Sequence, residues 1–230
     1  MTEKYFCMPG DIKVSEMREY LPDEPLFFLH IPRTGGNSLW AALKIWFGED
    51  KAHMVNPENP LPALPGHVYR QHFDRSVGWD IEKAYPEADQ FITMLRNPFD
   101  RVKSWYRHWK QVGSIGEKTT LEEFINVFRK KISLGLKDNL PQEYTYPHIL
   151  SDFVFVGITE RMQESLDCLA KILGRERIVA PHINKSTGST FSTADETCRL
   201  GSAMFDDVLI YEYARNLFSK ELMNRGLDAR

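Results

Sequence analysis

Nearly continuous apolar runs, each bounded by polar turns, recur along this chain and predict buried strands. The clearest are Leu26–Ile31, Gln90–Leu95 and Asp152–Gly157. A strand that is covered on one face alternates apolar and polar residues, whereas a strand covered on both faces is apolar almost throughout. These runs therefore predict strands in the middle layer of a sheet with helices packed on both of its faces.

Between these runs, apolar residues recur every three or four positions, which predicts amphipathic helices. The expected helices are one that opens at Ser38, a short one over Asp80–Tyr85, one that begins at Pro98, one from Thr120 to about Ile132, one over Glu160–Leu173, and a last one capped by Asp207 and ended by Gly226. Because strands alternate with helices, we predict an α/β fold: three layers, with a mainly parallel sheet and helices on both faces. We expect residues 1–230 to form a single domain, with an irregular segment over residues 1–25.

A basic, glycine-containing turn follows the first predicted strand. Residues 33–38 read Arg-Thr-Gly-Gly-Asn-Ser. Backbone N–H groups at a helix start have no partner within the helix, and the helix dipole favours negative charge there. Glycine lets the backbone come close to a bound anion, and the Arg, Thr and Ser side chains add donors. We therefore expect the turn to bind a phosphate-like or sulfate-like group, although an ordinary strand-to-helix turn remains the alternative.

The residues of the turn that we expect to contact the anion are Arg33, Thr34, Gly35, Gly36, Asn37 and Ser38. The turn is not the phosphate loop of a nucleoside triphosphatase, which reads Gly-x-x-x-x-Gly-Lys-Ser/Thr. Asn37 stands where that loop has its Lys, and Ile31 stands four residues before Gly35 in place of a glycine. The cation instead precedes the glycines, which suits an anion that protein cations hold directly, without a metal ion.

A second candidate anion site follows the predicted strand Gln90–Leu95. Arg96 stands at the end of that strand, and Asn97 and Pro98 are a favourable N-cap and first residue for a helix that carries Ser104. Open α/β sheets bind ligands beyond the carboxyl ends of their strands. The two strand ends are therefore expected to face one crevice. The alternative is that Arg96 pairs with Asp100 or caps the sheet.

Together the two sites resemble those of sulfotransferases that use 3′-phosphoadenosine 5′-phosphosulfate (PAPS). The segment HIPRTGGNSL is similar to the loop that binds the 5′-phosphosulfate, and LRNPFDRVKSWY is similar to the motif for the 3′-phosphate, with Arg96 and Ser104 at the family's separation. The carbohydrate O-sulfotransferases, such as the heparan sulfate uronyl 2-O type, are the most similar. The resemblance covers Leu26–Trp109 and is weaker over Phe153–Phe218. It implies a P-loop-like sulfotransferase fold and a loop that closes over the nucleotide through Lys185 and Ser186.

The resemblance also implies catalytic roles. The family has Lys where this chain has Arg33, which keeps the charge but offers a planar fork in place of a compact ammonium. In the 2-O type, a His in a Gly-His-Val setting takes the proton of the acceptor hydroxyl, and His67 matches it, with His72 as the second candidate. If this segment is a strand, the odd separation of the two places them on opposite faces, so that one faces the crevice. Either could instead be a surface or hydrogen-bonded core histidine.

The composition limits which classes of binding partner are expected. The formal net charge of the 230 residues is −3, so the positive potential that an anionic donor needs must be local. No basic stripe with interleaved aromatic residues is present, so nucleic-acid binding is not expected. No apolar run approaches the length of a membrane span, and the first twenty residues lack the apolar core of a signal peptide. Three widely spaced cysteines, at positions 7, 168 and 198, suggest neither a metal site nor a disulfide set, which favours a cytoplasmic protein.

The sequence thus predicts transfer of a sulfuryl group from PAPS to a hydroxyl, of a sugar or another small alcohol, without a metal ion. Two other functions remain open: a small-molecule kinase of the P-loop class, and a non-catalytic module that binds a nucleotide or anion. The kinase is disfavoured by the missing Gly-Lys-Ser/Thr and by the lack of a clear magnesium carboxylate at a strand end. The sequence leaves the oligomeric state open.

Overall fold

The computed structural model describes residues 16–56, 58–72, 78–133, 148–180 and 204–227. The strands are β1 (Leu26–Leu29), β2 (Ala52–Met54), β3 (Val68–Gln71), β4 (Phe91–Leu95) and β5 (Phe155–Ile158). The helices are α1 (Gly36–Phe47), α2 (Ile81–Ala84), α3 (Pro98–Gln111), α4 (Leu121–Ser133), α5 (Met162–Ile172) and α7 (Phe205–Asn224), with 3₁₀ turns η3 (His148–Asp152) and η4 (Thr159–Arg161). Residues 16–25, the described part of the segment expected to be irregular, form neither helix nor strand.

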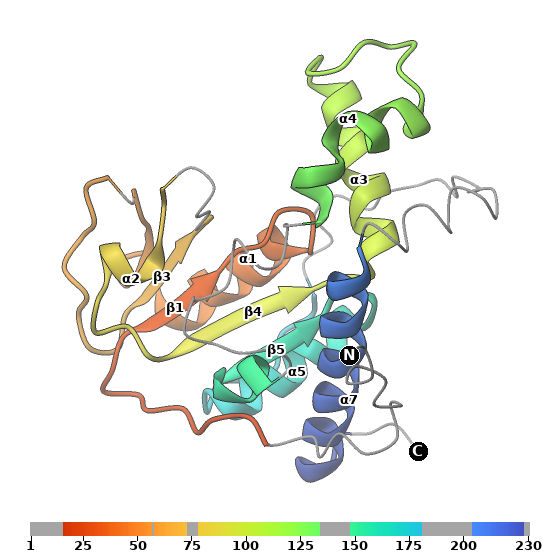
Figure 1. Ribbon diagram of the computed structural model, residues 1–230. Helices are drawn as coiled ribbons and strands as arrows, with labels where there is room; N and C mark the ends of the chain where they lie inside the picture. Colours follow the sequence, from red (N-terminus) through yellow and green to blue (C-terminus); the bar gives the residue numbers. More distant parts are fainter. Residues whose placement is uncertain (1–15, 57, 73–77, 134–147, 181–203, 228–230) are drawn as a thin grey trace, which may run out of the picture.

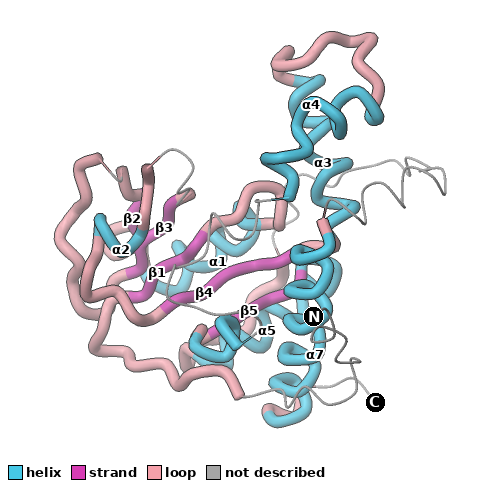
Figure 2. The backbone as a smooth tube through the Cα atoms, in the orientation of Figure 1, coloured by secondary structure: helices cyan, strands magenta, loops and turns pink. Residues whose placement is uncertain are grey.

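The strands form one sheet in the order β2-β3-β1-β4-β5, and every neighbouring pair is parallel (Figure 2). Every residue of β1, β4 and β5 is buried. Successive side chains of a strand point to opposite faces, so both faces of these strands are covered. Helix α1 contacts β2, β3 and β4, and in Figure 1 α5 and α7 lie beside β5. The predicted α/β class, with a parallel sheet between helical layers, is confirmed.

The register of the sheet brings the carboxyl ends of four strands to one edge. Phe27 of β1 pairs with Tyr69 of β3 and with Phe91 of β4, and Leu95 of β4 pairs with Ile158 of β5. The turns that follow β1, β3, β4 and β5 are therefore neighbours. The glycine turn and Arg96 both lie at this edge, which we call the carboxyl edge of the sheet.

Two of the helix starts predicted from the sequence, at Asn97 and Thr120, have the expected caps, and a third, at Asp207, does not. Asn97 Oδ1 accepts hydrogen bonds from the N–H groups of Phe99 and Asp100, and the Thr120 and Glu123 pair forms a reciprocal capping box before α4. The predicted cap Asp207 is wrong, because α7 begins at Phe205 and no side chain caps it. Asp207 is instead fully buried and pairs with a guanidinium.

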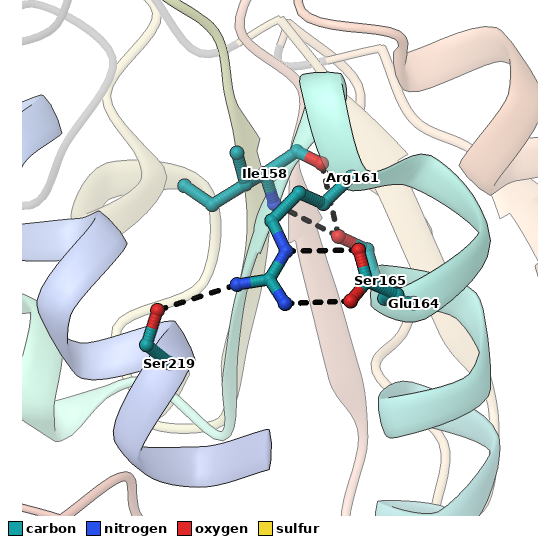
Figure 3. A network of polar contacts seen from close by, with 5 residues as sticks. All are labelled: Ile158, Arg161, Glu164, Ser165 and Ser219. Atoms are coloured by element: carbon teal, nitrogen blue, oxygen red, sulfur yellow. Dashed lines mark hydrogen bonds and ion pairs between the residues drawn. The ribbon is translucent and has the colours of Figure 1, made fainter. Parts of the chain in front are cut away.

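Arg161 links η4 to α5 and α7 (Figure 3). Its guanidinium donates to both carboxylate oxygens of Glu164, at 2.8 and 2.5 Å, and to Ser219 Oγ at 3.3 Å. Ser165 Oγ accepts from the N–H of Ile158 at 2.9 Å and donates to its carbonyl at 3.0 Å. These contacts fix the end of β5 against the two helices, and so fix the strand end that faces the candidate site.

A buried ion pair joins α3, which carries Ser104, to α7. Arg101 Nη2 lies 3.2 Å from Asp207 Oδ2, and both side chains are almost fully buried. Removing one partner of such a pair leaves the other charge buried and uncompensated. We expect Arg101→Met to lower the free energy of unfolding by about 3–5 kcal/mol, measured by urea denaturation.

The matched control is Arg215→Met, which removes the cation of an exposed pair with Glu212. We expect this variant to lose less than about 1 kcal/mol. Equal losses in the two variants would contradict the structural role assigned to the buried pair.

Candidate functional site

The turn between β1 and α1 has an unusual backbone. Arg33 has a φ of 70° and Gly35 a φ of 80°. Both therefore lie in the left-handed region of backbone conformation, which residues other than glycine rarely adopt. Gly35 is the N-cap of α1; it offers no side-chain cap, and the first turn of the helix holds no acidic residue. The N–H groups of Gly36 and Asn37 precede the first intrahelical hydrogen bond. Within the described residues of the turn and of the first turn of α1, no acidic side chain or side-chain cap therefore compensates the positive helix end.

The two glycines are required by close packing. A Cβ on Gly36 would lie 1.9 Å from His30 Cδ2 and 2.0 Å from His30 Nε2. A Cβ on Gly35 would lie 2.6 Å from Met162 Cε. These separations are far shorter than any van der Waals contact, so the glycines let the imidazole of His30 and the start of α5 come up against the helix end.

The structure brings Arg33 and Ser104 together from distant parts of the chain. Arg33 Nε donates to Ser104 Oγ at 3.2 Å, and Arg96 Nη1 donates to the carbonyl of Arg33 at 3.4 Å. Burial, followed by the charges of Arg96 and Arg107, lowers the pKa of the Arg33 guanidinium. Cations that lie this close repel one another unless an anion sits among them. The cluster is therefore suited to a multiply charged anion.

Arg107 was not singled out from the sequence. It lies on α3, one turn beyond Ser104, and its Nε donates to the carbonyl of Lys103 at 3.3 Å. Its spacing is the signal that would have found it: residues three apart on a helix share a face, so Arg107 lies on the same face of α3 as Ser104.

Three side chains of the turn are placed differently from the expectation. The Thr34 hydroxyl donates to the carbonyl of Ile31 at 2.8 Å and is fully buried, so it is not a donor for a bound anion. Asn37 Oδ1 accepts from Arg70 at 2.7 Å. Ser38 is buried, 6% exposed. The donors that the turn presents are thus mainly its backbone N–H groups and Arg33.

Thr159 connects the two turns, and sequence reasoning missed it. Its Oγ1 lies 2.6 Å from the carbonyl of Thr34 and 2.9 Å from the carbonyl of Leu95, so one hydroxyl proton is shared between the ends of β1 and β4. Glu160 Oε1 accepts from the N–H of Asn97. Both residues directly follow β5, at the same carboxyl edge, which is the only signal that the sequence offered.

The structure places the two candidate bases at opposite ends of β3. His72 follows the strand and lies beside the glycine turn, where its Nδ1 is 2.7 Å from the carbonyl of His30. His67 precedes the strand, and its carbonyl accepts from the N–H of Leu26 at the start of β1. Five residues of extended chain separate the two by about 16 Å. The expectation that His67 faces the crevice is therefore wrong, because His67 lies at the far edge of the sheet.

His67 has other partners at that far edge. Its Nδ1 lies 2.8 Å from His53 Nε2, and the two rings are stacked with centroids 5.1 Å apart. Pro60 and Leu61, in the proline-rich segment before His67, line a cavity of about 680 Å³ together with Tyr85. Arg33 is not among the residues that line this cavity.

His72 is suited to accept a proton. The carbonyl of His30 can only accept a hydrogen bond, so Nδ1 of His72 carries a proton, and in the neutral ring Nε2 has the free lone pair. The pKa of His72 is lowered, mainly by burial and further by the charge of Arg70, while the hydrogen bond to His30 opposes the shift. The ring is therefore neutral near pH 7.

Lys185 and Ser186 lie outside the described residues. Among the residues described, none of the helices has both the length and the apolar character needed to cross a bilayer. The described part of the chain also holds no cluster of three or more His, Cys, Asp and Glu side chains arranged to bind a metal ion.

No family model matches the chain, and neither does any curated protein. Two solved structures that resemble it are sulfotransferases. Mouse sulfotransferase SULT7A1, complexed with PAP, aligns over 93% of this chain and 87% of its own with 13% identity and a TM-score of 0.48. A sulfotransferase from Alicyclobacillus acidocaldarius aligns over 89% of this chain and 97% of its own with 15% identity and a TM-score of 0.45. At this level of similarity we base no assignment of family on either.

The packing of Gly36 generates a test. In Gly36→Ala, the new methyl group has to displace the His30 ring or the start of α1, and over-packing of this kind costs about 1–3 kcal/mol. We expect a loss of that size in the free energy of unfolding, measured in urea. Gly116→Ala is the control, since a Cβ there would meet only Thr119 Oγ1 at 3.5 Å. Equal stability of the two variants would show that His30 does not press on the turn.

Proposed function

We propose that this protein transfers a sulfuryl group from PAPS to a hydroxyl group of an acceptor. One observation carries the proposal: Arg33 at the end of β1 and Arg96 at the end of β4 meet beside Ser104 and an uncapped helix start. Two separate strand ends thus supply cations to one place, as a donor with anionic groups at both ends requires. The similarity of the segments HIPRTGGNSL and LRNPFDRVKSWY to the family motifs supports the same assignment.

The residues of the glycine turn bind the 5′-phosphosulfate end in this proposal. The N–H groups of Gly36 and Asn37 donate to sulfate and phosphate oxygens, and Arg33 places its charge at the bridging oxygen, where negative charge develops as the bond to sulfur breaks. Arg33 takes the place of the family's Lys. Gly35 lets the backbone turn beneath the anion, while Thr34 and Ser38 act from buried positions as supports of the turn.

Arg96 and Ser104 bind the 3′-phosphate, and Arg107 adds charge from the same helix. Lys185 and Ser186 close over the nucleotide in the proposal, as the resemblance implies. Transfer of a sulfuryl group is an in-line displacement with little covalent work for the protein, so position and charge account for the rate. No metal ion takes part.

His72 replaces His67 as the proposed base. Nε2 of His72 takes the proton of the acceptor hydroxyl while the acceptor oxygen forms its bond to sulfur; the bond between sulfur and the phosphate oxygen breaks, and 3′-phosphoadenosine 5′-phosphate leaves. The acceptor is a sugar or another small alcohol that enters at the carboxyl edge. We propose the carbohydrate O-sulfotransferases as the related group and the cytoplasm as the location.

A single-turnover assay with ³⁵S-labelled PAPS and a panel of sugars and small alcohols tests the proposal. We expect label to move to an acceptor in the presence of EDTA. A protein that binds the donor but moves no label is a nucleotide-binding module. A protein that is active only with ATP and magnesium is a kinase, and either result would reject the sulfotransferase.

If the arginine cluster binds the nucleotide, removing one of its arginines should weaken that binding. A hydrogen bond to a charged group contributes about 1.5–3 kcal/mol, so Arg33→Met and Arg96→Met should each raise the Kd for 3′-phosphoadenosine 5′-phosphate by about 10- to 100-fold, measured by calorimetry. Arg177→Met, which removes an exposed cation paired with Asp167, is the control and should leave the Kd unchanged. Unchanged affinity in the first two variants would separate the cluster from nucleotide binding.

The position of His72 predicts the effect on turnover. A general base contributes about 10²–10⁴-fold, so His72→Ala should lose that much in kcat while it still binds 3′-phosphoadenosine 5′-phosphate. His67→Ala, at the far edge of the sheet, should retain full activity. The opposite result would restore His67 as the base.

The same base sets the pH dependence. Because burial lowers the pKa of His72 below 6.5, its neutral, active form persists into mildly acidic solution. We expect the acid limb of kcat/KM to fall below pH 6.5, and this limb to be absent from the residual activity of His72→Ala. A limb centred above pH 6.5 would contradict this environment for the ring.

A further inference from the structure

Arg70 is a buried cation whose hydrogen-bond acceptors, in the described part of the chain, are neutral. It lies on β3, is 7% exposed, and donates to His30 Nδ1 from Nε at 3.1 Å and from Nη2 at 2.7 Å. Nη2 also donates to Asn37 Oδ1 at 2.7 Å. The guanidinium lies 5.9 Å from the ring centre of Phe28 and 5.6 Å from that of Trp40. Burial of a charge is costly, so this arrangement calls for a reason.

The contact with Arg70 fixes the protonation of His30. A guanidinium has no acceptor, so Nδ1 of His30 supplies the lone pair and its proton lies on Nε2. Burial, together with the charges of His72, Arg70 and Arg33, lowers the pKa of His30 to about 2. His30 therefore remains a neutral ring of one tautomer, and its Nε2 edge lies against Gly36.

His30 in turn fixes His72. The carbonyl of His30 accepts from Nδ1 of His72 at 2.7 Å, and the two rings are tilted by 32° with centroids 4.1 Å apart. A charged ring at position 30 would repel a proton on its neighbour, whereas a neutral ring allows His72 to receive one. Arg70 thus affects the protonation of His72 in two ways. Its own charge disfavours a second proton on His72, and its contact with Nδ1 of His30 keeps the His30 ring neutral.

We propose that Arg70 and His30 are positioning residues that hold His72 as the neutral tautomer with its proton on Nδ1 and its lone pair on Nε2. Through Asn37, the same guanidinium also fixes the first turn of α1. One buried cation therefore aligns the base with the anion-binding helix end. The inference rests on the proposed function for what the base acts upon; the tautomers and their dependence on Arg70 do not.

Nitrogen-15 NMR of histidine-labelled protein tests the inference without any donor. Two-bond proton–nitrogen spectra report which ring nitrogen carries the proton, and His72→Asn and His30→Asn assign the signals. From pH 5 to 9 we expect His72 with its proton on Nδ1 and an apparent pKa below 6.5, and His30 with its proton on Nε2 and no titration. A neutral His72 ring with its proton on Nε2, or a neutral His30 ring with its proton on Nδ1, would overturn the inference in the native protein itself.

Arg70→Met tests the dependence. We expect the apparent pKa of His72 to move up toward 6.5, His30 to begin to titrate or to populate both tautomers, and kcat at pH 6 to fall by about 10- to 100-fold. Arg70→Lys keeps the charge but lacks the fork that reaches two acceptors, so it should preserve the pKa of His72 better than the tautomer of His30. Circular dichroism selects folded variants. Unchanged histidine signals in a folded Arg70→Met protein would refute the role of Arg70.

The two proposals fail separately. If the tautomers are as expected and depend on Arg70 but no sulfate is transferred, the arrangement stands and the sulfotransferase is rejected. If sulfate is transferred but the histidine signals ignore Arg70, the enzyme stands and the positioning role is rejected.

Discussion

The parallel register of β1 with β3 and β4 is the constraint on which the candidate site depends. It aligns the ends of four strands at one edge, so that residues from the turns after β1, β3, β4 and β5 become neighbours although 126 positions separate Arg33 from Thr159. Thr159 then ties two of these turns together through the carbonyls of Thr34 and Leu95. A slip of one residue in any pair would reverse every side chain in the slipped strand, and the edge would lose its alignment.

Charge at this edge is concentrated in a protein that is acidic overall. Arg33, Arg96 and Arg107 lie near one another around Ser104, and Arg70 lies behind them under the helix start. Such a group destabilises the empty protein by mutual repulsion and becomes favourable once an anion is bound. A bound anion would therefore stabilise this edge of the fold.

Much of the fold could be predicted from the sequence, because its signals are local. Continuous apolar runs predicted β1, β4 and β5, and the Asn97 and Thr120 caps marked helix starts to within a residue. The edge strand β2 was missed, since three residues of modest burial leave no pattern. Asp207 resembled a cap from the sequence, but its partner Arg101 lies 106 positions away, and no local signal reports a pair of that separation.

The sequence singled out the arginines and the serine of the candidate site but not the buried residue Arg70 behind them. Arg33 and Arg96 were singled out because each closely follows a predicted strand. Ser104 was singled out because it lies in the second turn of the next helix, at the separation from Arg96 that the resemblance implies. His67 was misplaced because β3 has only four residues, and the sequence did not show that the two histidines lie before and after it. Arg70 was not singled out, because a cation inside a strand is typical of a solvent-facing position, and only the three-dimensional structure shows that its acceptors lie on the strand end and helix beside it.

The left-handed backbone of Arg33 has a consequence for the stability of this turn. A non-glycine residue in that region carries about 1–3 kcal/mol of conformational strain, which a glycine would relieve. This chain has a long charged side chain at that position, whereas glycine, the residue with the least strain there, has no charge. A glycine at position 33 would therefore relax the turn and at the same time remove the cation that lies beside the start of α1.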